Sequence, residues 1–153
     1  MFTPEEVETL RGRIVSRARV VDAGFASPCW ISDRARQPNG YTKLGYRGRT
    51  WLTHRLSWIV HRGGIPDGLV IDHLCRQRAC VNPDHLEPVS TRTNLLRGEG
   101  FVAHQAQQQR CLRGHPLSGD NLYRSPSRPD SRECLTCRRE ATRRSHARRR
   151  AGG

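Results

Sequence analysis

Hydrophobic residues recur at helical spacing near the N-terminus of the chain. Val7, Leu10 and Ile14 are three or four residues apart, so they share one face of a helix. Thr3 is followed by a proline and, three positions on, by an acidic residue, which is the pattern of a capped helix start. The sequence predicts a helix over residues 3–17 and an irregular segment over residues 18–28.

Short apolar runs separated by turn signals replace this pattern from residue 29 onward. The turn signals are Asn39-Gly40 and Arg47-Gly48. We expect strands over residues 29–32, 41–46 and 49–52, which together predict a small antiparallel sheet.

Helical spacing returns after Thr53, which can cap a second helix. Leu56, Ile59 and Val60 lie on one face of it, and the Gly63-Gly64 pair ends it. Two histidines of this helix, His54 and His61, are expected to be structural or exposed rather than catalytic.

The apolar run over residues 69–71 predicts a strand that ends at Asp72 and His73. Residues 74–85 show little periodicity and predict a loop, and residues 86–89 can form a return strand. Ser90 or Thr91 then caps a helix that carries Asn94 and ends at Gly98. The predicted order is strand, loop, strand, helix.

Composition limits how this chain can be stabilised. Its 153 residues are only 35% hydrophobic and include 14 glycines and 9 prolines, so the core must be thin. Six cysteines offer disulfides or metal sites, and the lack of an N-terminal apolar stretch resembling a signal peptide favours a reduced (host) cytoplasm and therefore metal. No apolar run approaches the length of a membrane span, so no membrane partner is expected.

The charge of the chain points to a polyanionic partner. The formal net charge is +13, and Lys43 is the only lysine among 27 basic residues. The planar fork of arginine matches two phosphate oxygens, which favours double-stranded DNA. The arginine-rich residues 138–150 are expected to form a flexible tail that orders along phosphates. The candidate DNA-binding residues are Lys43, Arg47, Arg49, Arg76, Arg78, Arg97, Arg138, Arg139, Arg143 and Arg144.

Three polar residues of the strand, loop, strand, helix segment can carry hydrolytic chemistry. Because imidazole titrates near pH ~6.5, His73 can take a proton from water at neutral pH if it is held in line with a phosphate. Asp72 and the side-chain oxygen of Asn94 are the hard ligands that Mg²⁺ or another divalent ion prefers. These residue types are compatible with metal-dependent phosphodiester hydrolysis, and their assignment to it follows from the family resemblance of this segment.

The same segment resembles a known nuclease family. Counted from His73, Cys75, Cys80, His85 and Asn94 fall at +2, +7, +12 and +21. With the Asp72-His73 pair, these spacings resemble HNH and His-Cys box homing endonucleases, which belong to the ββα-metal nuclease superfamily.

The resemblance, over residues 29–98, implies an α+β fold and a set of roles. His73 would be the general base, Asn94 would bind the catalytic ion, and a small basic sheet would enter a DNA groove. The implied ligands of a structural zinc ion are Cys75, Cys80, His85 and an upstream cysteine, which by this resemblance is Cys29.

His85 has a second interpretation. In ordinary HNH proteins an asparagine stands at this position and braces the base by hydrogen bonding. Asn82 is the alternative brace, in which case His85 rather than Asn94 would bind the catalytic ion. We prefer the zinc role for His85 because it leaves no cysteine unexplained.

A second cluster of ligands follows near the C-terminus. Cys111, His115, Cys134 and Cys137 form a C-x3-H and C-x2-C set that matches a second closed structural zinc site. The module resembles the zinc-ribbon-like or treble-clef-like appendages of phage HNH proteins. The expected organisation is an N-terminal helix and arm (1–28), a nuclease domain (29–98), a linker (99–110), a zinc module (111–140) and a basic tail (141–153).

The sequence therefore predicts a zinc-stabilised DNA endonuclease. By resemblance it is encoded by a phage or mobile element and serves homing or packaging. A zinc-containing DNA-binding protein without catalysis is the alternative. A homodimer is expected if both DNA strands are cut, since that requires two active sites.

Overall fold

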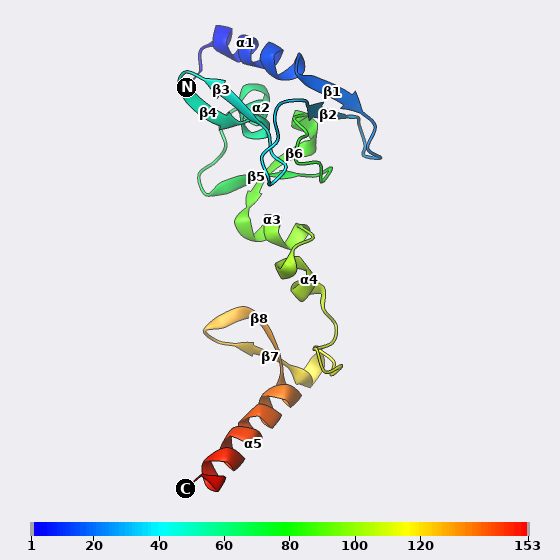
Figure 1. The fold of residues 1–153 in the computed structure, drawn as a ribbon, viewed down its shortest axis with the longest axis vertical. Helices are drawn as coiled ribbons and strands as arrows, with labels where there is room; N and C mark the ends of the chain where they lie inside the picture. The colour runs from blue at the N-terminus through cyan, green and yellow to red at the C-terminus, as the bar shows by residue number, and fades with distance from the viewer. Residues whose placement is uncertain (1, 153) are drawn as a thin grey trace. The chain divides into compact units, whose positions relative to one another are not determined.

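The computed structural model describes residues 2–152 and forms two compact units, whose boundary along the chain lies between Asn94 and Leu95 (Figure 1). The elements of the first unit are α1 (Pro4–Val15), β1 (Ala18–Val21), β2 (Cys29–Ser32), β3 (Lys43–Tyr46), β4 (Arg49–Leu52), α2 (Thr53–Arg62), β5 (Leu69–His73), the 3₁₀ turn η1 (Pro83–His85) and β6 (Leu86–Ser90). Helix α3 (Thr91–Arg97) continues into the second unit.

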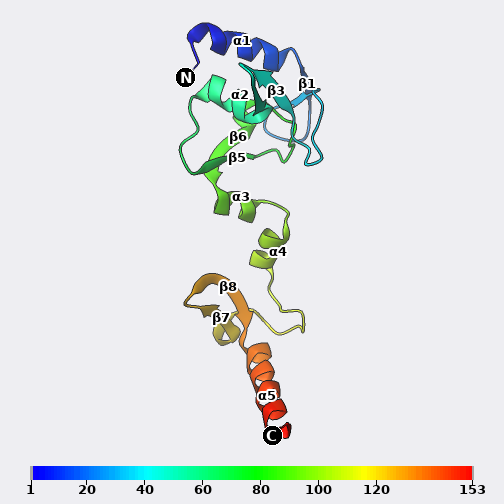
Figure 2. The same cartoon turned by 60° about the vertical axis from the view of Figure 1, so that its left-hand side comes forward.

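Helix α1 confirms the predicted N-terminal helix. The Thr3 hydroxyl accepts a hydrogen bond from the Glu6 backbone N–H at 3.3 Å, and the Glu6 carboxylate accepts one from the Thr3 N–H at 2.9 Å. This reciprocal capping satisfies N–H groups that have no partner within the helix. Leu10 and Ile14 are buried, and α1 packs against α2 (Figure 2). The core of this unit comprises Leu10, Ile14, Leu44, Leu56, Val60 and Val81.

The strands of the first unit form separate hairpins rather than the one small sheet expected over residues 29–52. Part of the segment expected to be irregular is strand β1, which pairs antiparallel with β2. Strand β3 pairs with β4 through a turn in which Arg47 and Gly48 both have positive φ, 51° and 67°. Such a turn matches the twist of a two-stranded hairpin, so β3 and β4 pair directly with each other.

Helix α2 ends as predicted but begins differently. The residue before its first turn is Leu52, which makes no side-chain cap, whereas Thr53 was expected to cap. Gly63 ends the helix with φ 97°, a conformation that favours glycine.

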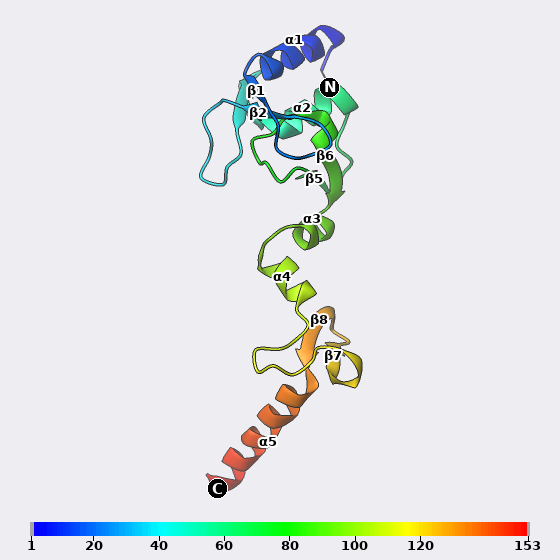
Figure 3. The same cartoon turned by 90° about the vertical axis from the view of Figure 1, so that its right-hand side faces the viewer.

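Strands β5 and β6 and helix α3 form the predicted strand, loop, strand, helix segment (Figure 3). His73 pairs with Leu86 in register, and Leu69 pairs with Ser90 at the other end of the hairpin. The Ser90 hydroxyl accepts a hydrogen bond from the Thr93 N–H at 3.0 Å and so caps α3.

The second unit consists of α4 (Phe101–Gln107), η2 (Gly119–Asn121), β7 (Leu122–Ser125), β8 (Arg128–Cys134) and α5 (Leu135–Ala151). The segment expected to be a flexible tail is therefore helical almost to the end of the chain. Its sequence lacks glycine and proline up to residue 151 and contains alanine and arginine, which are strong helix formers. Among residues 2–152, no helix is both long and apolar enough to cross a membrane.

Candidate active site and metal centres

His73 lies at the end of β5, and a single hydrogen bond fixes its tautomer. Its Nε2 is 3.1 Å from the carbonyl oxygen of Cys80, and the side chain is buried. Because a carbonyl only accepts hydrogen bonds, Nε2 carries the proton and Nδ1 of the neutral ring is left as a proton acceptor. Burial lowers the pKa of His73, outweighing nearby groups that raise it. The neutral form that a base requires is thereby favoured.

Two further rings pack against His73. The ring of His54 lies 4.8 Å from the His73 ring and 4.8 Å from the Tyr41 ring, centroid to centroid, and Tyr41 is 5.8 Å from His73. Burial lowers the pKa of His54 to about 3, so this ring is also neutral. His54 is thus buried as a structural residue, as expected, but its packing against the candidate base was not foreseen.

No local sequence pattern identifies this ring cluster, since its members come from three segments. The only hint lies in α2, where the polar residues Thr53, His54 and Ser57 share the buried face with Leu56. The other histidine of α2, His61, is half-buried, with Nδ1 2.8 Å from the Ser57 carbonyl and its ring near Trp30.

Asp72 precedes His73 and is paired with a cation. Arg76 donates to its Oδ1 at 3.0 Å, and only 4% of the Asp72 side chain is exposed. Arg76 adopts the left-handed conformation, φ 58°, which costs a non-glycine residue on the order of 1 kcal/mol. The Asp72 carboxylate, which was expected to bind a catalytic ion, is therefore paired with an arginine whose own backbone is strained.

Asn94, the other expected ligand of the catalytic ion, is half-buried in α3. The β5–β6 register places the start of α3 beside Leu69, at the opposite end of β5 from Asp72. Asp72 and Asn94 can therefore bind the same ion only if α3 runs back beside the β5–β6 hairpin toward Asp72. That the two residues share an ion stays a prediction.

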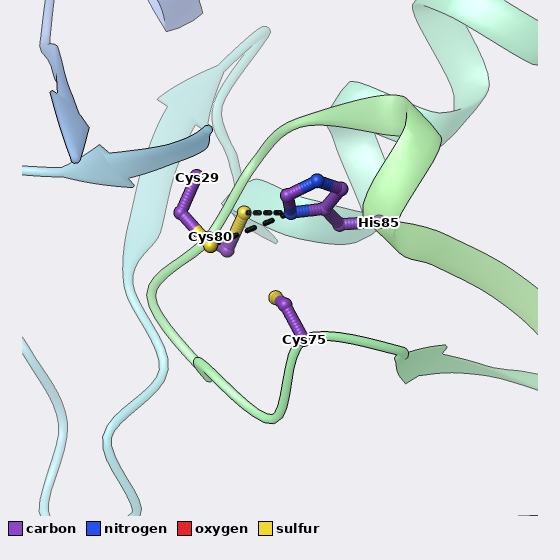
Figure 4. A group of neighbouring side chains, drawn as sticks. All are labelled: Cys29, Cys75, Cys80 and His85. Carbon is purple, nitrogen blue, oxygen red and sulfur yellow. Dashed lines mark hydrogen bonds between the residues drawn. The ribbon is translucent and has the colours of Figure 1, made fainter. Parts of the chain in front are cut away.

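The first Cys/His cluster gathers Cys29, Cys75, Cys80 and His85, whose ligand atoms all lie within 4.8 Å of one another. Figure 4 shows Cys29 reaching in from β2, the other two cysteines from the loop after β5, and His85 from η1. His85 Nδ1 is 3.4 Å from the Cys29 sulfur and 3.6 Å from the Cys80 sulfur. These separations suit a tetrahedral zinc ion, whose bonds to sulfur are about 2.3 Å long.

The thiols of this cluster influence one another's ionisation. The hydrogen bond from the Cys80 thiol lowers the pKa of Cys75 to about 5, while the pKa of Cys80 is raised by its contact with Cys75 and by burial. Burial also raises the pKa of Cys29. Crowded thiols cannot all ionise unaided, because thiolates repel each other, and a divalent cation removes that conflict.

The protein supports His85 from outside the cluster. The Ser27 hydroxyl lies 2.8 Å from His85 Nε2, and the Phe25 ring packs on the imidazole with centroids 4.6 Å apart. If His85 binds metal through Nδ1, Nε2 carries a proton and donates it to Ser27, which fixes the ring orientation. Sequence reasoning missed both residues, because the segment before Cys29 carries no motif.

Asn82 does not act as the brace of His73. Its amide donates to the Pro28 carbonyl at 2.9 Å, and its side-chain oxygen accepts from the Asp84 N–H at 3.0 Å. Since His85 lies among the cysteines and Asn82 caps η1, the geometry favours the zinc interpretation of His85 over its rival.

The second cluster gathers Cys111, His115, Cys134 and Cys137, again with ligand atoms within 4.8 Å of one another. The first pair lies in a turn, and the second pair lies at the end of β8 and in the first turn of α5. A turn, a hairpin and a helix arranged in this order resemble a treble clef more than a zinc ribbon. The backbone N–H of Cys137 lowers the pKa of Cys134 to about 6, and burial raises the pKa of Cys137 to about 11.

The candidate DNA-binding residues fall into two groups. Four of them interact with other residues of the protein. Arg47 forms an ion pair with Glu6, and Arg76 forms one with Asp72. Arg78 donates a hydrogen bond to the Asn39 carbonyl and lies over the Tyr41 ring, and Arg138 lies over the Tyr123 ring. Arg97 on α3 also makes an interaction within the protein, and the other exposed positions, on β3, β4 and α5, are Lys43, Arg49, Arg139, Arg143 and Arg144.

Comparison with known proteins recognises the middle of the chain. Residues 52–96 match the HNH endonuclease family. A 47-residue stretch is 40% identical to the uncharacterized gene 5.3 protein of Enterobacteria phage T3, and it covers 31% of this chain and 46% of that protein. The chain thus spans about half the length of this relative. No solved structure matches.

The segment that matches the HNH endonuclease family runs from the end of β4 into α3. Within it lie Asp72, His73, Asn94 and three ligands of the first cluster. Cys29 and the whole second cluster lie outside the residues that match the family. The family match therefore does not cover them, and it is the structure that brings Cys29 to the first cluster and assembles the second.

Proposed function

We propose that this chain is a metal-dependent DNA endonuclease in which His73 is the general base. The observation that carries the proposal is the hydrogen bond from His73 Nε2 to the carbonyl of Cys80. It leaves Nδ1 as the acceptor and ties the base to a loop held by the first Cys/His cluster. The similarity to a phage protein supports a phage or mobile-element origin, with homing or packaging as candidate roles.

In the proposed reaction, Nδ1 of His73 removes a proton from water as the water oxygen attacks phosphorus. The bond from phosphorus to the 3′ oxygen breaks, leaving a 5′-phosphate and a 3′-hydroxyl once that oxygen is protonated. Arg78 lies close enough to His73 to lower its pKa, and so its charge can also act on a phosphate bound there. The ring of His54 limits rotation of the base.

The donor sets fit the metals expected from the sequence. Three cysteines and a histidine in each cluster suit structural Zn²⁺. Asp72 and Asn94 offer the oxygen ligands that Mg²⁺ prefers, with Arg76 as the group to be displaced from Asp72. When bound there, the divalent ion would supply positive charge to the phosphate and the leaving oxygen.

The proposal is tested by incubating the purified chain with supercoiled plasmid and Mg²⁺. The wild type should nick the plasmid, and His73→Ala should lower the rate by at least about 100-fold, the contribution of a general base. His104→Ala is the matched control, because His104 is an exposed histidine on α4. Absence of nicking by the wild type, or equal rates for wild type and His73→Ala, would refute the proposal.

A DNA-binding protein without catalysis is the second candidate. It is favoured by the side chains of Asp72 and His73, each only 4% exposed, and by the Arg76 ion pair that occupies the carboxylate. Under this alternative Arg76→Ala would not produce nicking in Mg²⁺, whereas in the enzyme it should lower the Mg²⁺ concentration needed for half-maximal activity.

A further inference from the structure

Helix α5 is a long basic element that contacts η2 and the β7–β8 hairpin through its first turn and is exposed from Ala141 onward. It runs from Leu135 to Ala151 and has no buried residue. From Ala141 to its end it contains no acidic residue. Burial against the rest of the chain therefore does not explain why this helix is present or so strongly charged.

The arginines of α5 are unevenly distributed around the helix. At 3.6 residues per turn, Arg139, Arg143, His146 and Arg150 are spaced by four, three and four residues and form one continuous stripe. We call these four residues the α5 stripe. Arg149 lies near one edge of it.

One flank of the stripe is not basic, because Glu140, Ala147 and Ala151 lie there, roughly a quarter turn away. The opposite side of α5 carries two arginines, Arg144 and Arg148, next to Ala141 and Ser145. Glu140 is also the only acidic residue in the helix, and it pairs with Arg113 at 2.7 Å. The adjacent arginine pairs of α5 do not all share one face, but Arg139, Arg143 and Arg150 do.

The charge of the stripe is not neutralised within the protein. Arg138, at the start of α5, lies 4.0 Å from the Tyr123 ring centroid and pairs with Glu133 at 3.5 Å. Within residues 2–152, the arginines of the stripe form no such ion pair. Arg139 and Arg143 stand four residues apart, and like charges at that spacing destabilise a helix. An external anion would relieve this repulsion.

We propose that the α5 stripe binds the phosphates of double-stranded DNA and that the second Cys/His cluster holds the helix for that purpose. Cys134 precedes the first turn of α5 and Cys137 lies within it, so the cluster fixes the N-terminal end of the helix. Guanidinium groups spaced along one face match a row of phosphates. An anionic membrane is the poorer match, because membrane-surface helices have a large apolar face, whereas α5 beyond its first turn offers only alanines.

This inference rests on the proposed function only in taking DNA as the partner. Binding is measured with full-length His73→Ala protein and a fluorescent random-sequence duplex without added Mg²⁺, so cleavage plays no part. The test variant is Arg139→Gln with Arg143→Gln. The matched control is Arg144→Gln with Arg148→Gln, which removes the same charge at the same four-residue spacing from the other side of the helix.

The stripe variant should bind about tenfold or more weakly at low salt, and the slope of log affinity against log salt should fall by about 2. The control should lose clearly less affinity, and both variants should keep two zinc ions per chain. Helical circular dichroism should rise when DNA is added to the wild type and rise less for the stripe variant.

Equal losses of DNA affinity in the two variants would overturn the proposal. They would mean that DNA binding depends on the total charge of α5 and not on which side of the helix carries it. Tighter and equally face-dependent binding to phosphatidylserine vesicles would overturn it in favour of a membrane partner. The wild type could fail to nick plasmid while the stripe variant still loses more DNA affinity than the control variant. That outcome would refute the nuclease function and leave this inference intact.

Discussion

The two units each contain a cluster of three cysteines and one histidine, but the clusters lie in different surroundings. In the first, Cys29, Cys80 and His85 are fully buried, and the loop between β5 and β6 joins the cluster to the candidate base. In the second, Cys134 alone is buried, and the cluster joins a turn to the start of an exposed helix.

The difference indicates that one ligand set serves two purposes. The first unit has an apolar core of its own, built around α1 and α2, so its cluster positions a loop on an existing scaffold. In the described part of the second unit, the buried apolar side chains are Ala103, Leu117 and Cys134. Such a core is too small to fold a domain unaided, so we expect the metal to supply the stability.

Removing one ligand from each cluster should give the largest contrast. Cys80→Ser should reduce zinc from two ions per chain to one and lower nicking by at least about 100-fold, because the carbonyl that holds His73 moves. Cys134→Ser should also remove one zinc ion, but it should unfold the second unit, since structural zinc contributes roughly 10 kcal/mol or more to folding. Zinc analysis, nicking and circular dichroism measure these effects.

For Cys134→Ser we expect nicking to persist at saturating plasmid, with more plasmid needed for half-maximal rate. All three tryptophans, Trp30, Trp51 and Trp58, lie in the first unit, so their fluorescence shows whether that unit stays folded. Loss of the tryptophan signal in Cys134→Ser would contradict the independence of the two clusters.

Acid should destabilise the first unit through His54. The pKa of His54 is lowered to about 3 mainly by burial, whereas an unfolded histidine titrates near 6.5. Between these values the unfolded chain binds a proton that the folded chain does not, so stability is full above pH ~6.5 and falls as the pH is lowered, by on the order of 4 kcal/mol. Urea unfolding followed by tryptophan fluorescence at several pH values measures this.

His54→Phe keeps a ring beside His73 and removes the titrating nitrogens, so it should flatten this pH dependence. The thiols of the first cluster also bind protons in acid, and the difference between the two proteins isolates the share of His54. Identical pH dependence in wild type and variant would show that His54 is not held neutral by the fold.

Truncating one leucine in each unit should show whether apolar packing or bound metal provides most of that unit's folding stability. Leu56 is fully buried in the first core, and Leu56→Ala should cost about 2–5 kcal/mol there. Leu117, 6% exposed in the second unit, belongs to neither of the buried apolar clusters of the described residues, so Leu117→Ala should cost less while zinc is bound. Thermal unfolding with and without a zinc chelator compares them, and equal losses would argue that both units depend on packing.

Local patterns predicted most of the fold around the site. Helix α1, strands β2, β4, β5 and β6, and the Ser90 cap of α3 follow from spacing and capping residues that lie within a few positions of each other. Spacing singled out the second set of metal ligands and Cys75, Cys80 and His85 of the first, and the family resemblance added Cys29; the structure brings each set together.

Contacts between distant segments were not predictable in this way. Strand β1 was missed because its partner β2, not its own composition, makes it a strand. The packing of Tyr41 and His54 on His73, and of Ser27 on His85, joins segments with no shared motif. The helical state of α5 was not predicted, because a run of arginines with no apolar face is typical of a flexible tail.

The smallest expected effect concerns the hydrogen bonds behind each cluster. Ser27→Ala removes the acceptor of His85 Nε2 in the first cluster. Asn121→Ala removes the amide that donates to the Cys134 sulfur at 3.4 Å in the second. Such partners typically change metal affinity by about 10–100-fold. Because His85 is fully buried and also held by Phe25, Ser27→Ala should fall at the low end, and competition with a chelating dye should show a larger loss for Asn121→Ala. The reverse order would mean that the exposed cluster, not the buried one, is the more rigidly preorganised.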